Sequence, residues 1–120
     1  MIFHRKNATA IESYNCHGGS GLLQCREMLA DYKKKAPGFK YIHEDLLEPG
    51  ASIGEHTHHG DEEVYIFLEG HGVMRIDGQE SPVGPGDVCL TRDGQSHHLT
   101  NSADGPMRFY VICANTGEHR

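Results

Sequence analysis

Two histidines and a pair of glutamates in the middle of the chain have the residue types and spacing of a metal site. His56 and His58 are two residues apart, so on a strand both imidazoles would point to one face and could chelate one ion. Glu62 and Glu63 follow a turn-forming stretch, and a return strand would bring one of their carboxylates beside the imidazoles. A fourth ligand would have to come from a distant segment, and GQSHHLTN, residues 94–101, offers a histidine at the start of a strand.

Imidazole and carboxylate ligands suit borderline divalent ions, namely Fe, Mn, Ni, Cu or Zn. With four protein ligands, an octahedral ion keeps two positions open for substrate or water, which suits Lewis-acid or oxygen chemistry. The alternative is a histidine-rich surface loop that holds no ion. The H-x-H spacing with a nearby acid is common, and by itself it does not decide between the two.

The bulk properties of the chain limit its partners. A chain of 120 residues predicts one domain with a single core. Its formal net charge of -6 argues against binding to nucleic acid or to a membrane surface, because phosphates and anionic lipids do not attract an acidic chain. There is no apolar run typical of a signal peptide, and none near the roughly 20 residues of a membrane span, so we expect a cytoplasmic protein. The 4 cysteines form no C-x-x-C pair, and we expect free, mostly buried thiols.

Short runs rich in Val, Ile, Tyr and Phe alternate with glycine- and proline-containing turns, which predicts antiparallel strands. The runs lie at residues 39–47, 63–70, 72–77, 86–91, 96–101 and 107–114. No long helical segment interrupts them, and the pattern is typical of an all-β sandwich or barrel.

The single domain divides into an N-terminal arm (1–40), a barrel (41–113) and a C-terminal tail (114–120). Within the arm, GLLQCRE at residues 21–27 is compatible with a strand or a helix. We favour the strand, followed by an irregular or short helical piece that ends near Pro37.

The region around the histidines resembles the first motif of the cupin family, G-x5-H-x-H-x3,4-E-x6-G. Its positions are occupied here by Gly50, His56, His58, Glu63 and Gly70. Both glutamates satisfy the x3,4 spacing, but only Glu63 leaves six residues before Gly70. The resemblance therefore selects Glu63 over Glu62.

The second cupin motif, G-x5-P-x-G-x2-H-x3-N, follows fifteen residues later. It is matched by Gly86, Gly94, His97 and Asn101, with Arg92 where the family usually has proline. That departure concerns the shape of a turn more than ligation. The two motifs together imply an all-β fold, the cupin jelly-roll barrel of antiparallel strands. They also imply one divalent transition metal ion (Zn, Ni, Fe, Mn or Cu) held by His56, His58, Glu63 and His97.

Strand alternation assigns further side chains to the pocket. Tyr65 and Phe67 share a face with Glu63 and should line the pocket above the metal. His43 and Asp45 share one face of the strand at 39–47, which would look either into the barrel or to solvent. His43, Asp45 and Tyr65 are thus the candidate proton-transfer groups.

The remaining histidines fit the ligand set less well. His59 and His98 directly follow candidate ligands in the sequence, so their side chains point to the opposite face of the strand. We expect them to be exposed, or to contact a ligand side chain without contacting the ion. His4, His17 and His119 lie near termini or in loops, where we expect solvent exposure, and His71 lies in a turn.

The strand that carries Glu63 is apolar on its other face as well. Val64, Ile66 and Leu68 point away from the pocket, and a barrel this small has little chain to cover them. We therefore expect a homodimer packed against this strand, as many cupins of this size form.

These features support two classes of function. The first is a small metal-dependent enzyme, a dioxygenase, isomerase or decarboxylase of the cupin type, acting on a small organic acid, sugar-like or phenolic substrate inside the barrel. The second is a non-catalytic cupin that binds a metal or small molecule as a sensor or accessory module. No nucleotide motif or substrate clamp narrows the choice of ligand.

Overall fold

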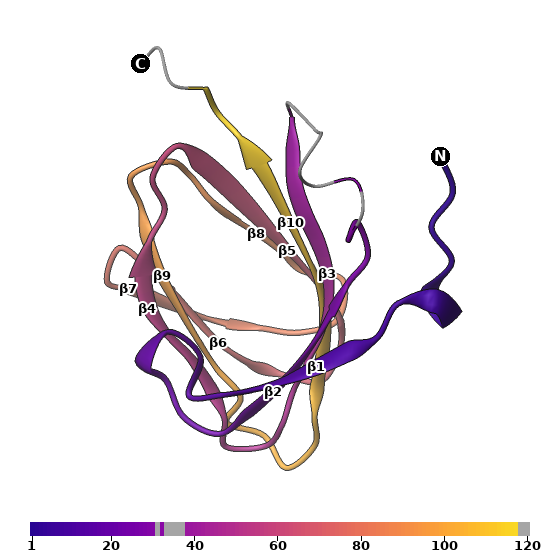
Figure 1. Ribbon diagram of the computed structural model, residues 1–120. Helices are drawn as coiled ribbons and strands as arrows, with labels where there is room; N and C mark the ends of the chain where they lie inside the picture. Colours follow the sequence, from indigo (N-terminus) through magenta and orange to yellow (C-terminus); the bar gives the residue numbers. More distant parts are fainter. Residues whose placement is uncertain (31, 33–37, 118–120) are drawn as a thin grey trace.

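A computed structural model describes residues 1–30, 32 and 38–117, and two antiparallel sheets that face each other form the fold (Figure 1). The strands in this part of the chain are β1 (Ala10–Tyr14), β2 (Leu22–Glu27), β3 (Phe39–Leu47), β4 (Ser52–Thr57), β5 (Asp61–Glu69), β6 (Gly72–Ile76), β7 (Gln79–Val83), β8 (Val88–Thr91), β9 (Ser96–Thr100) and β10 (Met107–Asn115), and the short 3-10 helices are η1 (Arg5–Asn7) and η2 (Cys16–Gly18).

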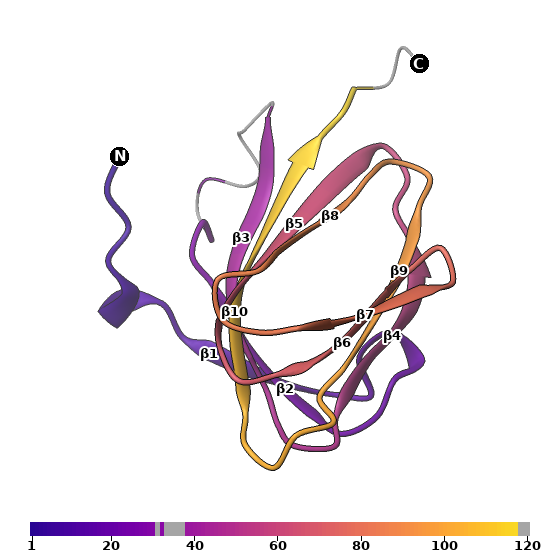
Figure 2. The same ribbon diagram turned by 180° about the vertical axis from the view of Figure 1, so that it is seen from behind.

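One sheet has six strands in the order β1-β2-β3-β10-β5-β8, and the other has four in the order β4-β9-β6-β7. Seen from behind, the two sheets enclose a barrel, and the chain passes from one sheet to the other several times (Figure 2). The predicted all-β jelly-roll fold is therefore confirmed. In the part of the chain that the structure describes, there is no helix long and apolar enough to cross a membrane.

Two inner strands of nine residues each, β5 and β10, show why this sequence closes into a barrel. In β5 and β10 the side chains alternate between buried and half-buried positions over the whole strand, as expected when one face covers a core. Phe67 and Phe109, on neighbouring strands, are both fully buried with ring centroids 5.6 Å apart. Glu63 lies on the same inner face as this aromatic core, so the strand carries a charged group directly into the barrel.

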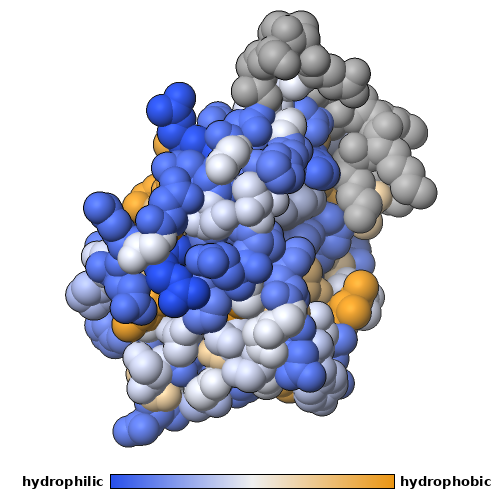
Figure 3. All heavy atoms as spheres, turned by 90° about the vertical axis from the view of Figure 1, so that its left-hand side faces the viewer, coloured by the Kyte–Doolittle hydropathy of each residue, from blue (hydrophilic) through white to orange (hydrophobic). Residues whose placement is uncertain are grey.

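The outer face of β5 is apolar, and it continues onto the edge strand β8. Val64 pairs with Leu90, and Ile66 pairs with Val88. Val88 and Leu90 remain 60% and 47% exposed. We call these four residues the β5/β8 apolar face. By comparison, the side of the molecule seen in Figure 3 is mostly hydrophilic with isolated apolar side chains.

The N-terminal segment extends the larger sheet. The predicted strand within GLLQCRE is β2, which pairs along its length with β3. The irregular or helical piece expected before Pro37 falls mostly on residues 31 and 33–37, outside the described residues. Arg5 anchors η1 by donating two hydrogen bonds to the Glu44 carboxylate, at 2.6 and 3.0 Å.

Candidate metal centre

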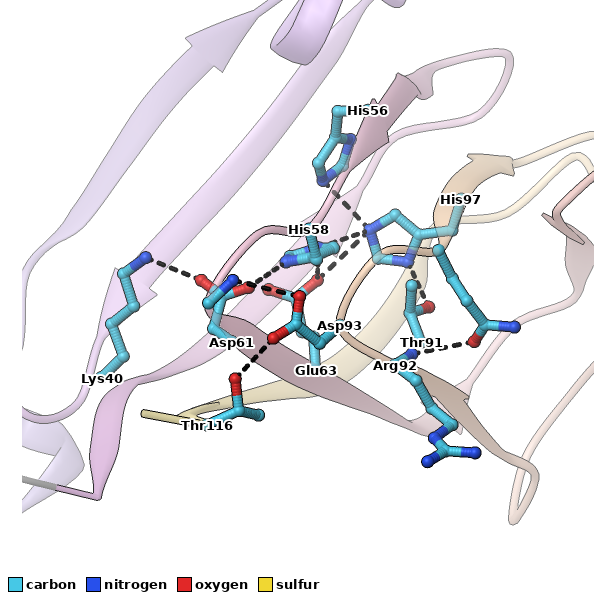
Figure 4. Close-up of polar contacts among 12 residues, drawn as sticks. Lys40, His56, His58, Asp61, Glu63, Thr91, Arg92, Asp93, His97 and Thr116 are labelled. Carbon is cyan, nitrogen blue, oxygen red and sulfur yellow. Dashed lines mark hydrogen bonds and ion pairs between the residues drawn. The ribbon is translucent and has the colours of Figure 1, made fainter. Parts of the chain in front are cut away.

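The four side chains that the motifs single out lie together at one end of the barrel, where the two sheets approach each other (Figure 4). His56 on β4 and His97 on β9 are direct cross-strand partners in the smaller sheet. His58 follows the end of β4, and Glu63 comes from β5 in the larger sheet. The group therefore joins the two sheets, and one ligand atom from each residue lies within 4.8 Å of the others.

The distances between these atoms are short and similar. Nε2 of His97 lies 3.0 Å from Nε2 of His56 and 3.1 Å from Nε2 of His58. Oε1 of Glu63 lies 3.2 Å from Nε2 of His58 and 3.3 Å from Nε2 of His97. Neighbouring ligands about 2.1 Å from a common ion are separated by about 3.0 Å in an octahedron and about 3.4 Å in a tetrahedron. The observed spacing therefore fits one ion of this class.

In two of the three rings, the outer nitrogen shows which nitrogen is available for a metal. Nδ1 of His56 lies 2.8 Å from the carbonyl oxygen of Gly54, which can only accept a hydrogen bond. Nδ1 of His58 lies 2.7 Å from Oδ1 of Asp61, and a carboxylate also accepts. Both rings therefore carry their proton on Nδ1 and present the Nε2 lone pair to the centre, as metal-ligating histidines do.

Glu63 supplies a further sign that a cation belongs at the centre. Its side chain is 3% exposed, and Oε1 is buried with no hydrogen-bond partner among the described residues. Its other oxygen accepts a hydrogen bond from the Tyr41 hydroxyl. Three imidazole lone pairs and a carboxylate oxygen facing one point repel one another unless a cation or a proton lies between them. The donor set therefore fits a divalent metal ion.

The pKa shifts show how burial and pairing act on these groups. Burial lowers the pKa of His97 to about 4, so this ring is neutral and able to ligate at physiological pH. Burial alone would raise the pKa of Glu63, but pairing with His58 and Tyr41 outweighs it and keeps this carboxyl ionised. Pairing with Glu63 raises the pKa of His58. Without an ion, a proton on His58 would supply the positive charge beside Glu63.

Two further contacts hold the imidazoles of the candidate ligands His97 and His58. Oγ1 of Thr91 lies 2.7 Å from Nδ1 of His97, and Asp61, which contacts His58, is itself 2.7 Å from Nζ of Lys40. Thr91, Asp61 and Tyr41 were not predicted as part of the site. No spacing rule in the sequence identifies them, because their roles depend on which strands become neighbours.

The turn that carries Arg92 is closed without the usual proline. The Arg92 amide donates to Oε1 of Gln95, and the Gln95 amide donates to the carbonyl oxygen of Arg92, both at 2.9 Å. Oδ1 of Asp93 accepts from the Gly60 amide at 3.1 Å. Oδ2 of Asp93 accepts from the Thr116 hydroxyl at 2.7 Å. These hydrogen bonds replace the conformational restriction that proline would give, and His97 still reaches the centre.

A cavity of about 280 Å³ adjoins two of the four residues, His56 and Glu63. Its lining includes His43, Asp45 and Tyr65, the three candidates for proton transfer, together with His56 and Glu63. Asp45 is 4% exposed, and burial raises its pKa to about 7. The expectation that Phe67 lines the pocket is wrong. Phe67 lies deeper along β5, where it packs in the core and does not border the cavity.

His17 is the residue at this site that sequence reasoning missed. Its ring stacks on that of His56, with centroids 3.7 Å apart and planes at 13°, and it lines the same cavity. The contact depends on a close approach of η2 to β4. A Cβ atom on Gly54 would lie 2.1 Å from the carbonyl oxygen of His17, so only glycine fits there. His4, His17, His59 and His71 are exposed, and His98 is half-buried. His119 lies outside the described residues.

A sequence model of the cupin domain matches residues 44–113 of this chain. The chain belongs to the cupin family. This cupin is 32% identical over 114 residues to an oxalate-binding protein from Thermotoga maritima, an alignment that covers 93% of this chain and 92% of that protein.

Two solved structures show the same fold at more than 25% identity. A predicted oxalate decarboxylase from Thermotoga maritima superposes with a TM-score of 0.88 at 29% identity, covering 96% of this cupin and 99% of that chain. A Cupin 2 conserved barrel domain protein from Salinispora arenicola has a TM-score of 0.67 at 26% identity, covering 78% and 76% of the two chains.

Proposed function

We propose that this cupin holds one divalent transition metal ion between His56, His58, Glu63 and His97 and uses it to bind a small carboxylate of the oxalate type. The observation that carries the proposal is the convergence of three Nε2 atoms and one buried carboxylate oxygen beside a small cavity. The similarity to an oxalate-binding protein over almost the whole length of both chains supports the choice of ligand.

The ligand geometry suits a chelating dicarboxylate. Four protein ligands would leave two positions of an octahedral ion open. If these positions are adjacent, the two carboxylates of oxalate would fill both and close a five-membered ring with the ion. The cavity volume of about 280 Å³ is at the low end for a ligand pocket, which favours a molecule of this size over a sugar nucleotide.

The charge of the cavity makes binding depend on the ion. The described residues that line it include the carboxyl groups of Asp45 and Glu63 but no lysine or arginine. A dianion would therefore be repelled by the negative charge of the cavity wall. A bound divalent cation would make the electrostatic potential there favourable for an anion.

Isothermal titration of oxalate into ion-loaded protein, ion-free protein and His97→Ala tests the proposal. We expect one oxalate per chain in the loaded protein and no measurable binding in the other two samples. Acetate, which offers one carboxylate, should bind at least tenfold more weakly than oxalate. Metal analysis after the titration shows that oxalate has not removed the ion. Equal affinity of the loaded and ion-free proteins for oxalate would refute the proposal.

A second candidate function is decarboxylation, and the position of Asp45 favours it. Cleavage of the carbon–carbon bond of oxalate releases carbon dioxide and leaves a carbon that must accept a proton to become formate. Asp45 lines the cavity, and with a pKa of about 7 it can hold a proton at neutral pH. His43 contacts Glu27 at 3.1 Å, and burial raises the pKa of Tyr65 well above its usual value, so neither matches this role as well.

Formate production from carbon-13-labelled oxalate, followed by nuclear magnetic resonance, separates the two candidates. A decarboxylase would yield formate in the wild type and lose turnover in Asp45→Asn while still binding oxalate. A binding protein would yield no formate with either chain, although both chains bind the ligand.

A further inference from the structure

A second group of metal-ligating side chains lies on the wall of the cavity formed by β2 and β3. Cys25 on β2 is the direct cross-strand partner of Asp45 on β3, and His43 precedes Asp45 by two residues on the same face. All three line the cavity. One ligand atom from each lies within 4.8 Å of the other two. A sulfur, a nitrogen and an oxygen donor therefore meet at one place, apart from the three histidines and Glu63.

In the described part of the chain, one oxygen of the Asp45 carboxyl group lacks a hydrogen-bond partner, although the Cys25 thiol hydrogen-bonds to this side chain. The residue is 4% exposed, and its Oδ1 atom is buried without a hydrogen-bond partner among the described residues. Burying a polar oxygen with no partner is costly, and such groups in folded proteins normally contact a donor or a cation. No lysine or arginine lines the described part of the cavity, so the protein itself supplies no permanent cation there.

The donor set also defines the class of ion. Thiolate, imidazole and carboxylate are the three ligand types of protein zinc sites, and a site with three protein ligands keeps a position open. Oε1 of Glu27 lies 3.1 Å from Nε2 of His43, the kind of carboxylate–histidine contact that orients imidazoles beside zinc. Hard ions such as Mg²⁺ or Ca²⁺ would instead require more oxygen ligands than this wall offers.

We infer that Cys25, His43 and Asp45 form a second metal site, for Zn²⁺ or a similar thiophilic divalent ion, in the same cavity. Binding would displace the thiol proton of Cys25 to solvent, so that thiolate and carboxylate together balance the charge of the ion. Since Asp45 cannot ligate an ion and carry a proton on the same oxygen, an occupied second site removes the acid that decarboxylation would need. The inference goes beyond the proposed oxalate site, and its ligands share no residue with that site.

Cobalt(II) titration of ion-free protein tests the second site, because only a thiolate ligand gives cobalt an intense near-ultraviolet charge-transfer band. We expect two cobalt ions per wild-type chain, one of which produces the band. Cys25→Ser should lose the band and one ion. The matched variants Cys16→Ser and Cys89→Ser should keep both, although Cys16 also lines the cavity. A phosphine reductant keeps all thiols reduced.

Two further variants keep the result decisive. Asp45→Asn retains every cysteine and should raise the cobalt concentration needed for half of the band at least tenfold, which covers the case that Cys25→Ser does not fold. His58→Ala should lose the other ion and keep the band, so failure of the first site is distinguishable from failure of the second. A single cobalt per chain without the band, or a band that survives Cys25→Ser, would overturn the inference.

Discussion

The hydroxyl oxygen of Thr91 lies 2.7 Å from Nδ1 of His97, on the side of the ring away from the candidate metal centre. Thr91 and Glu63 are cross-strand partners in the larger sheet, whereas His97 belongs to the smaller one. This contact therefore links His97, a candidate ligand in the smaller sheet, to the strand beside Glu63, a candidate ligand in the larger sheet. The hydroxyl can donate or accept here, and when it accepts, the proton of His97 lies on Nδ1 and Nε2 is left for an ion.

Thr91→Val should lower metal affinity by about 10- to 100-fold, the usual effect of removing a group that orients a metal-ligating histidine. Competition with a chromophoric chelator measures this. Thr100→Val is the matched control, because Oγ1 of Thr100 lies 3.4 Å from Nδ1 of His98, which is not a ligand. Equal affinities of the two variants would show that the Thr91 contact does not orient His97.

His17→Asn should lower metal affinity by a smaller factor, roughly 2- to 12-fold, because a stacked ring pair contributes about 0.5–1.5 kcal/mol. Asparagine suits the left-handed backbone of this position, where φ is 53°. The Gly54 carbonyl still holds His56 in the variant. The same chelator competition measures the effect, and a loss as large as that of His97→Ala would instead make His17 a ligand.

Asp45→Asn should change how the stability of ion-free protein depends on pH. The folded pKa of Asp45 is about 7, against about 3.9 in an unfolded chain. A carboxyl with a raised pKa contributes stability that is fully present below the unfolded pKa and is lost as pH rises through the folded pKa. Between about pH 4 and pH 7, the free energy of unfolding of wild type should fall by up to about 4 kcal/mol relative to that of Asp45→Asn.

Urea denaturation of both chains across this pH range checks the Asp45 prediction, and Asp104→Asn, at an exposed position, serves as the control. Parallel pH profiles of wild type and Asp45→Asn would contradict a raised pKa at this residue.

Leu90→Lys should turn the expected homodimer into a monomer, because it places a charge on the β5/β8 apolar face beside Val64. Burying an unpaired ammonium group in an interface costs more than a small dimer contact supplies. Light scattering at micromolar concentration measures the mass. Tyr14→Lys, on the opposite edge strand of the same sheet, should leave the mass unchanged. A monomeric wild type would remove the basis for the dimer.

The strands that the sequence predicts best are those whose apolar residues recur without interruption by a turn residue. The expected range 39–47 coincides with β3, and 107–114 differs from β10 by one residue. β7 was missed, because its residues are mostly exposed and include Pro82, which only an edge strand tolerates. β1 was missed for a similar reason, since it is a short edge strand with little burial.

The candidate site divides in the same way. Local spacing draws attention to His56 and His58 but leaves Glu62 and Glu63 as alternatives. The resemblance to the two cupin motifs selects Glu63 and adds His97. The stacking of His17 on His56 depends on how η2 crosses β4, and no local pattern encodes such a crossing. The wrong placement of Phe67 has a related cause. Alternation gives the face of a residue but not its position along the barrel, and Phe67 packs in the core without lining the cavity.

Metal analysis of tag-free wild type and His97→Ala, purified in parallel, tests the central claim most directly. Nε2 of His97 contacts Nε2 of both His56 and His58 and lies near Glu63, so no other side chain shares as many close contacts within the group. We predict that the variant carries one divalent ion fewer per chain than wild type, with an unchanged circular dichroism spectrum. Equal metal content in two folded chains would contradict the assignment of this centre.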